Sequence, residues 1–113
     1  MKLAIIGSRT VGSFDLEDNI PTGVTEIITG GARGVDTLAA QYAERNNISL
    51  TIIKPDYKRY GKAAPILRNK EIVRAADFVL AVWDGSSRGT ASVIELAKKE
   101  NKQCRVIIPN VDK

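Results

Sequence analysis

Three short stretches of this 113-residue chain combine glycine with hydroxyl and arginine side chains, residue types that suit anion binding. They are Gly7-Ser8-Arg9, the run Thr29 to Asp36, and the run Asp84 to Thr90. Glycine allows positive φ and lets a ligand approach main-chain N–H groups, and a helix N-terminus adds partial positive charge. These stretches are candidate phosphate-binding loops, although a glycine turn can also serve only as a tight corner.

Polar residues within these stretches have both a ligand-binding and a local structural interpretation. Asp36 can hold a ribose hydroxyl or stabilise a helix N-terminus, and Asp84 can act as a general base, bind ribose or shape a turn. Ser86, Ser87 and Thr90 can donate to phosphate or cap the following helix. The sequence leaves these alternatives open.

Arg33 and the amino-acid composition narrow the chemistry. A cation at a helix start is disfavoured unless an anion lies nearby, so Arg33 favours the anion-binding interpretation. The chain has no histidine and one cysteine, Cys104, which we expect in the core. This composition excludes Ser-His and Cys-His pairs, histidine metal sites and an internal disulfide. We expect no metal and no cofactor, and the acid–base candidates are Asp84 and Glu95.

The positive charge of the chain is concentrated in one segment. The formal net charge is +4, and the segment from Lys54 to Arg74 alone contains seven basic and two acidic residues. Within it, Tyr57 and Tyr60 alternate with basic residues, which suits stacking on nucleic-acid bases. The segment therefore indicates an anionic ligand or nucleic acid, or a solvated basic face.

Short apolar runs alternate with helical patterns along the chain. We expect strands at residues 3–6, 26–29, 49–53, 78–82 and 105–108, and helices at residues 13–20, 33–46, 65–75 and 90–101. This order predicts an α/β fold: a single Rossmann-like domain over residues 1–113, with a five-stranded, mainly parallel sheet and helices on both faces. The three candidate loops all follow strands, so they should converge on one crevice at the carboxyl ends of the strands.

Two familiar phosphate-binding fingerprints do not fit the loops. A dinucleotide fingerprint in register with Gly31 and Gly34 would need glycine where Thr29 stands. A Walker A loop starting at Gly7 would need lysine and a hydroxyl residue where Ser13-Phe14 stands. A nicotinamide dehydrogenase and an ATPase are therefore disfavoured.

Four motifs together resemble the SLOG superfamily. They are Ile6 to Arg9, Thr29 to Asp36, Leu67 to Lys70 and Ser87 to Ala91, and they follow the order and spacing of that superfamily over almost the whole chain. Its members include the DNA-processing protein DprA (Smf), the Lonely Guy phosphoribohydrolases and small proteins of the YspA type, which are nearest in size. The resemblance implies a Rossmann-like fold.

The members of this superfamily differ in function. Resemblance to DprA implies a basic pocket for single-stranded DNA, and resemblance to Lonely Guy enzymes implies hydrolysis of nucleotides. In Lonely Guy enzymes a catalytic glutamate follows the Gly-Thr pair within a few residues, where this chain has Ala91-Ser92-Val93, and Glu95 comes two residues later. Resemblance to the YspA type implies binding of nucleotide-derived ligands.

We therefore expect a binder of a nucleotide-derived, phosphate-containing small molecule that acts as a sensor or sequestering protein. The alternatives are DprA-like binding of single-stranded DNA, through Tyr57, Lys58, Arg59, Tyr60 and Lys62, and phosphoribohydrolase activity. The expected ligand-binding residues are Gly7, Ser8, Arg9, Thr29, Gly30, Gly31, Ala32, Arg33, Gly34, Asp36, Arg68, Asp84, Ser86, Ser87, Arg88, Gly89 and Thr90.

Two expectations concern the assembly and the location of the protein. The resemblance implies a homodimer or higher homo-oligomer. Met1-Lys2 leads directly into an apolar strand without a signal-peptide pattern, and no apolar run is long enough to span a membrane. We therefore expect a cytoplasmic protein without a membrane partner.

Overall fold

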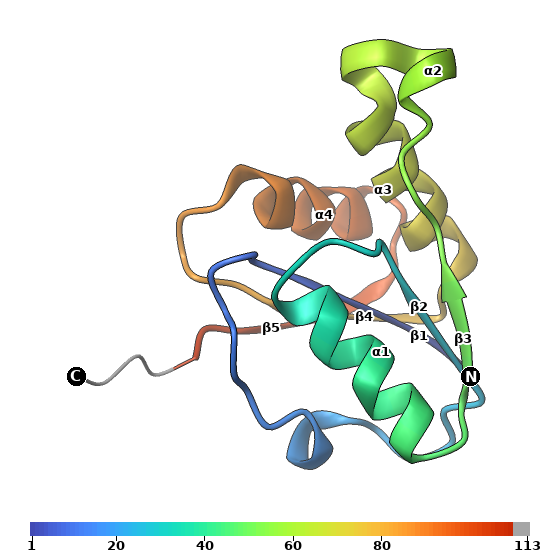
Figure 1. The fold of residues 1–113 in the computed structure, drawn as a ribbon, viewed down its shortest axis with the longest axis vertical. Helices are drawn as coiled ribbons and strands as arrows, with labels where there is room; N and C mark the ends of the chain where they lie inside the picture. The colour runs from blue at the N-terminus through green and yellow to red at the C-terminus, as the bar shows by residue number, and fades with distance from the viewer. Residues whose placement is uncertain (110–113) are drawn as a thin grey trace.

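The five strands form one parallel sheet in the computed structural model, which describes residues 1–109 (Figure 1). The strands are β1 (Lys2–Gly7), β2 (Glu26–Thr29), β3 (Ser49–Ile52), β4 (Phe78–Val82) and β5 (Gln103–Ile107). Their order is β3-β2-β1-β4-β5, and all four pairs of neighbours are parallel. The predicted α/β fold with a five-stranded sheet is confirmed.

Helices cover both faces of the sheet, as predicted. The α-helices are α1 (Val35–Arg45), α2 (Tyr57–Tyr60), α3 (Ala64–Ala75) and α4 (Arg88–Lys99), with short 3₁₀ turns η1 (Glu17–Asn19) and η2 (Gly61–Ala63). None of the helices in residues 1–109 is long and apolar enough to cross a membrane. The single domain predicted for residues 1–113 includes residues 110–113, which lie outside the described residues.

The central strands are buried on both sides because their side chains alternate between two cores. Odd positions of β1, such as Leu3 and Ile5, pack with the residues of α1. Even positions, such as Ala4 and Ile6, pack with the residues of α3 and α4. A fully buried Leu, Ile or Val side chain contributes about 1.5–3 kcal/mol. These cores fix the directions in which the loops leave β1, β2 and β4.

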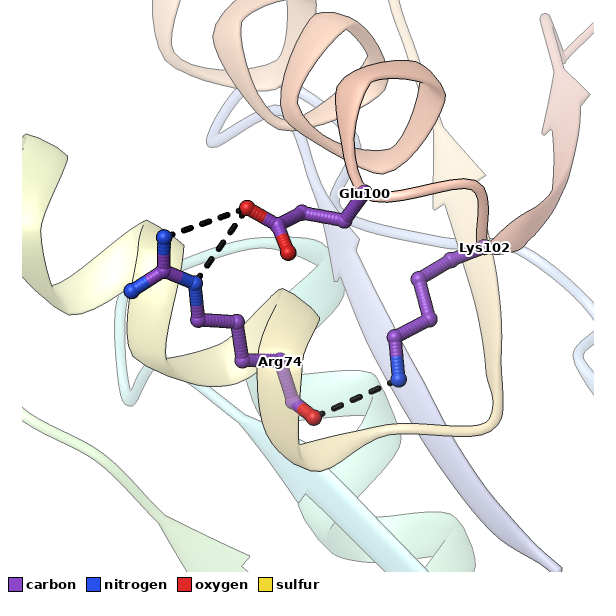
Figure 2. A network of polar contacts seen from close by, with 3 residues as sticks. All are labelled: Arg74, Glu100 and Lys102. Atoms are coloured by element: carbon purple, nitrogen blue, oxygen red, sulfur yellow. Dashed lines mark hydrogen bonds and ion pairs between the residues drawn. The ribbon is translucent and has the colours of Figure 1, made fainter.

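A polar network joins the end of α3 to the segment after α4 (Figure 2). Lys102 Nζ donates to Ala76 O at 2.7 Å and to Arg74 O at 3.3 Å. The Arg74 guanidinium donates from Nε and Nη2 to Glu100 Oε2, both at 3.2 Å. The lysine charge also complements the negative end of the α3 dipole. The position of α3 relative to α4 is therefore fixed at one end, opposite the loops.

Several expected boundaries were wrong, for local reasons. The helix expected at residues 13–20 is only the 3₁₀ turn η1, because Asp15 Oδ1 accepts from Glu17 N and competes with helical bonding. Helix α1 begins at Val35 instead of residue 33, because Gly34 has φ of 76°. The loop expected after β3 contains α2, which Asp56 caps by accepting from Arg59 N at 3.2 Å.

The bounds of the carboxyl-terminal elements also differ from the predicted ones. Helix α4 begins at Arg88 and ends at Lys99, two residues before the predicted positions at both ends. Strand β5 begins at Gln103 instead of residue 105. Cys104 is only partly buried against the core beneath α3 and α4, and this burial raises the pKa of its thiol.

Candidate functional site

A pocket of about 260 Å³ opens at the carboxyl ends of β1, β2 and β4. Strand order reverses between β1 and β4, the place where α/β sheets bind ligands. The lining residues come from three loops and from one side each of α3 and α4: Ile6, Gly7, Ser8, Arg9, Thr10, Gly30, Ala32, Asp36, Pro65, Arg68, Asn69, Ile72, Asp84, Ser87, Gly89, Thr90 and Val93. The predicted convergence of the three loops is what the structure shows.

Ser8 connects the β1 loop to the other two loops. Its hydroxyl accepts from Asp84 N at 2.9 Å and lies 2.7 Å from Ser87 Oγ. Its carbonyl accepts from Val35 N at 3.5 Å, at the start of α1. Ser8 is nearly fully buried, so these contacts are shielded from water. The hydroxyl of Ser87 continues the chain by donating to Thr90 Oγ1 at 3.2 Å.

The N-terminus of α4 presents unpaired amide groups at the pocket. Ser87 is the N-cap residue, but its side chain makes no capping bond because it is bonded to Ser8 and Thr90 instead. The first helical amide with a partner is Ala91 N, which donates to Ser87 O at 3.2 Å. Within residues 1–109, no acceptor is found for the amides of Arg88, Gly89 and Thr90. This end of α4 can therefore bind an anion.

The carboxylate of Asp36 holds the glycine turn after β2 in place. Asp36 Oδ2 accepts from Gly30 N at 3.2 Å and from Ala32 N at 3.1 Å. Burial of this side chain, which is 5% exposed, raises the pKa of Asp36, and the two amides and Arg68 oppose that shift. Thr29 Oγ1 has no hydrogen-bond partner within residues 1–109, although it lies close enough to lower the same pKa. Asp36 thus occupies amides that we expected a phosphate to use.

Gly34 brings the glycine turn against the β1 loop. A Cβ atom at this position would meet Ser8 O and would lie 2.8 Å from Arg9 Cα and Arg9 O. Its φ of 76° is also a backbone conformation that side chains rarely adopt. Gly34 therefore serves the packing of the two loops, and it does not line the pocket.

Arg68 reaches across the pocket from α3. Its Nη1 donates to Gly30 O at 2.8 Å, and its Nε donates to Asn69 Oδ1 at 2.9 Å. Partial burial lowers the pKa of Arg68, Asp36 opposes this shift, and Arg9 adds to it through charge repulsion. Two guanidinium groups therefore lie near one another beside the pocket, an arrangement that an anion would stabilise.

Asp84 lines the pocket, but hydrogen bonds engage its carboxylate. Oδ1 accepts from Ser86 N at 2.9 Å and Ser87 N at 2.8 Å, and Oδ2 accepts from Thr10 Oγ1 at 2.8 Å. The bonds from the two serine amides, followed by that of Thr10, lower the pKa of Asp84 well below its usual range. The carboxylate therefore stays ionised and shapes the turn before α4.

The predicted site residues separate into three groups. Eleven of the seventeen line the pocket, whereas Thr29, Gly31, Arg33, Gly34, Ser86 and Arg88 do not. The second catalytic candidate, Glu95, is exposed on α4 away from the pocket lining. The residues of the nucleic-acid alternative, Tyr57, Lys58, Arg59, Tyr60 and Lys62, are all exposed and also lie outside the pocket.

Sequence reasoning missed six lining residues. Ile6, Ile72 and Val93 belong to strand and helix faces whose apolar pattern indicates only core. Thr10 and Pro65 have no signal that distinguishes them from loop and helix-start residues. Asn69 stands beside Arg68 in the motif shared with the SLOG superfamily, and that motif was the one available signal.

Comparison with known proteins gives two matches. Residues 1–60 match the family described as "YspA, cpYpsA-related SLOG family" (YAcAr). Gene 61 protein of Mycobacterium phage D29 is 39% identical over an alignment of 79 residues, which covers 65% of this chain and 63% of that protein. The match thus covers less than two thirds of the relative. No solved structure gave a significant match. The resemblance inferred from the four motifs is confirmed.

Replacing Gly34 should destabilise the protein strongly. In Gly34→Ala the new Cβ meets main-chain atoms of Ser8 and Arg9 and the positive φ becomes strained, so we expect the free energy of unfolding to fall by about 3 kcal/mol. Gly12→Ala is the matched control because a Cβ there has no neighbour within 4 Å. Urea denaturation measures both, and equal stability of the two variants would contradict this role of Gly34.

The buried Asp36 should make stability depend on pH. Burial raises the pKa of Asp36 in the folded protein above its ordinary value of 3.8. Relative to Asp36→Asn, wild type is therefore most stable below that pH and loses this stability as pH rises through the folded pKa. The free energy of unfolding of wild type minus that of Asp36→Asn should therefore fall with rising pH. Urea denaturation of both proteins from acidic to neutral pH measures this difference, and an increase with pH would show a depressed pKa instead.

Proposed function

This chain belongs to the YspA, cpYpsA-related SLOG family, and on that premise we propose that its pocket binds a nucleotide-derived small molecule through a single phosphate group. The protein acts as a sensor or sequestering protein for this ligand. The observation that carries the proposal is the unpaired N-terminus of α4, which stands beside three hydroxyl groups in the pocket.

The phosphate site is formed by α4 and the β1 loop. The amides of Gly89 and Thr90 supply main-chain donors at the positive end of the helix dipole. The hydroxyls of Ser8, Ser87 and Thr90 lie within hydrogen-bond distance of one another and can turn toward phosphate oxygens. Arg68 and Arg9 supply the neutralising charge.

The occupied amides of the other turns favour a single phosphate. Asp36 already accepts from the amides of Gly30 and Ala32, and Asp84 already accepts from those of Ser86 and Ser87. A second phosphate in either place would have to displace a carboxylate and would meet its negative charge. The site therefore suits a monophosphate better than a diphosphate or triphosphate.

The rest of the pocket suits the sugar of such a ligand. Ile6, Ile72 and Val93 give it an apolar floor, and Asn69 lies beside them with its Oδ1 already engaged by Arg68. The free amide donors of Asn69 complement ligand oxygens.

Binding without hydrolysis fits the placement of the two acid–base candidates. The Asp84 carboxylate is engaged on both oxygens and has a lowered pKa, which makes it a poor proton donor. Glu95 is exposed and does not line the pocket. Neither carboxylate is thus arranged to protonate a leaving base.

A charge placed at Gly89 tests the phosphate site. A side chain at this position has open space, and Asp in the first turn also favours the helix dipole, so Gly89→Asp should fold normally. It should bind nucleoside monophosphates at least about tenfold more weakly than Gly89→Asn, which has the same shape without the charge. Calorimetry measures the affinity, and emission of Trp83, whose indole N–H donates to Ser87 O at 3.0 Å, reports the site.

Two outcomes would rule out this proposed function. One is the absence of any nucleotide binding tighter than millimolar by wild type. The other is equal affinity of the Gly89→Asp and Gly89→Asn variants, which would place the phosphate elsewhere.

A second candidate function is single-stranded nucleic-acid binding by the basic arm, residues 54–63. The observation that favours it is the exposure of Tyr57 and Tyr60, at 59% and 42%. The Arg59 guanidinium carbon lies 5.3 Å from the centre of the Tyr60 ring, which holds a cation beside a stacking surface. Aromatic faces next to cations bind nucleotides with little sequence preference.

Replacement of a basic arm residue should reduce the salt dependence of nucleic-acid binding. For Lys58→Ala we expect weaker binding of oligothymidylate and a shallower slope of log K against log salt, by about 0.7 for one lost phosphate contact. Lys98→Ala, at the far end of α4, is the control that should behave as wild type. Anisotropy titrations at several salt concentrations measure both, and no binding at low salt would rule out this function.

A further inference from the structure

The basic arm lies beyond the carboxyl end of β3, where α2 projects away from the sheet (Figure 1). In addition to its two tyrosines it exposes four basic residues, Lys54, Lys58, Arg59 and Lys62. None of these four makes an ion pair within residues 1–109. The positive charge of the arm is therefore available to a partner of negative charge.

An outer groove of about 540 Å³ runs between the basic arm and α3. Lys54 and Tyr60 line one side, and Arg68, Lys70 and Arg74 line the other. The groove also contains the carboxylates of Asp56 and Glu71. Four basic residues line the groove against these two acidic ones, so positive charge predominates. The groove offers charge and an aromatic face together.

Arg68 lines both the pocket and the outer groove. In the pocket its guanidinium donates to Gly30 O, and in the outer groove Arg68 lines the wall together with Lys70 and Arg74. The route from the N-terminus of α4 to the basic arm therefore passes along one arginine. A ligand longer than a mononucleotide can follow this route without leaving positively charged surface.

We propose, on the basis of the proposed phosphate site, that the pocket holds the terminal phosphate of a single-stranded nucleic acid whose following nucleotides lie along Arg68, the outer groove and the basic arm. The terminal phosphate binds at Gly89 and Thr90. The next phosphates meet Arg68 and Lys54, and bases stack on Tyr57 and Tyr60.

The pocket selects an end of a strand because its inner loops bind no further phosphate. Asp36 occupies the amides of Gly30 and Ala32, and Asp84 occupies those of Ser86 and Ser87, so the strand leaves the pocket toward the positive charge of Arg68. An acidic peptide would match the charge of the groove, but it would use neither the exposed tyrosine faces nor the phosphate-binding donors at the N-terminus of α4. A phosphorylated nucleic-acid end uses both.

The experiment compares three forms of one oligothymidylate of about ten nucleotides, a length within the usual range of single-strand sites. The forms carry a 5′-phosphate, a 3′-phosphate or no terminal phosphate, and a dye at the opposite end reports binding by anisotropy. We expect one phosphorylated form to bind about tenfold more tightly than the unphosphorylated form. The preferred form identifies which end is recognised.

Variants separate the two parts of the site. Gly89→Asp should abolish the preference for the phosphorylated form and leave the weaker binding of the unphosphorylated form, whereas Gly89→Asn should keep the preference. Lys58→Ala should weaken binding of all three oligonucleotides and leave the calorimetric affinity for a mononucleotide unchanged. Poly-glutamate should compete poorly against the phosphorylated oligonucleotide.

Equal binding of all three forms would overturn the proposal even if mononucleotides bind in the pocket, since the arm and the pocket would then act separately. Competition by poly-glutamate as strong as that by the phosphorylated oligonucleotide would overturn it as well. If wild type binds no mononucleotide, the proposed function is contradicted. A retained preference for a phosphorylated end in that case would still support the strand-end site.

Discussion

The site depends on Ser8, which contacts all three loops from one buried position between β1 and β4. Its amide donates to Val82 O at 3.0 Å, its carbonyl accepts from Val11 N and Val35 N, and its hydroxyl accepts from Asp84 N. An apolar side chain there would leave buried polar groups unsatisfied, which costs about 1–3 kcal/mol each. The approach of the loops, and thus the pocket itself, follows from the packing of this small hydroxyl residue.

Two aspartates accept hydrogen bonds from some of the main-chain amides in the loops, and those amides are then not available to a ligand. Asp36 follows its glycine-bearing turn and Asp84 begins the other one, and each lies close enough in sequence to accept from amides of its turn. They act as built-in anions, so the turns keep their shape without a ligand. The N-terminus of α4 differs because its cap residue, Ser87, directs its hydroxyl toward Ser8. At this end of α4 the amides of Gly89 and Thr90, which line the pocket, therefore keep no acceptor within residues 1–109.

The sequence predicted the sheet and the convergence of the loops because both depend on strong apolar runs and on the geometry of parallel strands. It could not assign roles within the loops. From the sequence, Asp36 can serve a ligand or a helix N-terminus and Asp84 can serve a ligand or a turn, and only the direction of each carboxylate decides between these roles. Gly34 and Gly89 look alike in sequence, yet one has main chain against it and the other has open space. Asn69 and the apolar floor were missed because their patterns also fit ordinary core.

The position of α3 relates the basic segment of the chain to the site. Polar contacts of Arg74 and Lys102 hold one end of this helix to the segment after α4 (Figure 2), so its other end keeps a fixed relation to the loops. Arg68 lies near that other end. Two of its N–H groups donate to Gly30 O and Asn69 Oδ1, so only its remaining donors are available to a ligand. The arm cations have no such internal partner in residues 1–109. The unpaired positive charge of the arm lies at the mouth of the site, where an extended anion would meet it after its terminal group had bound.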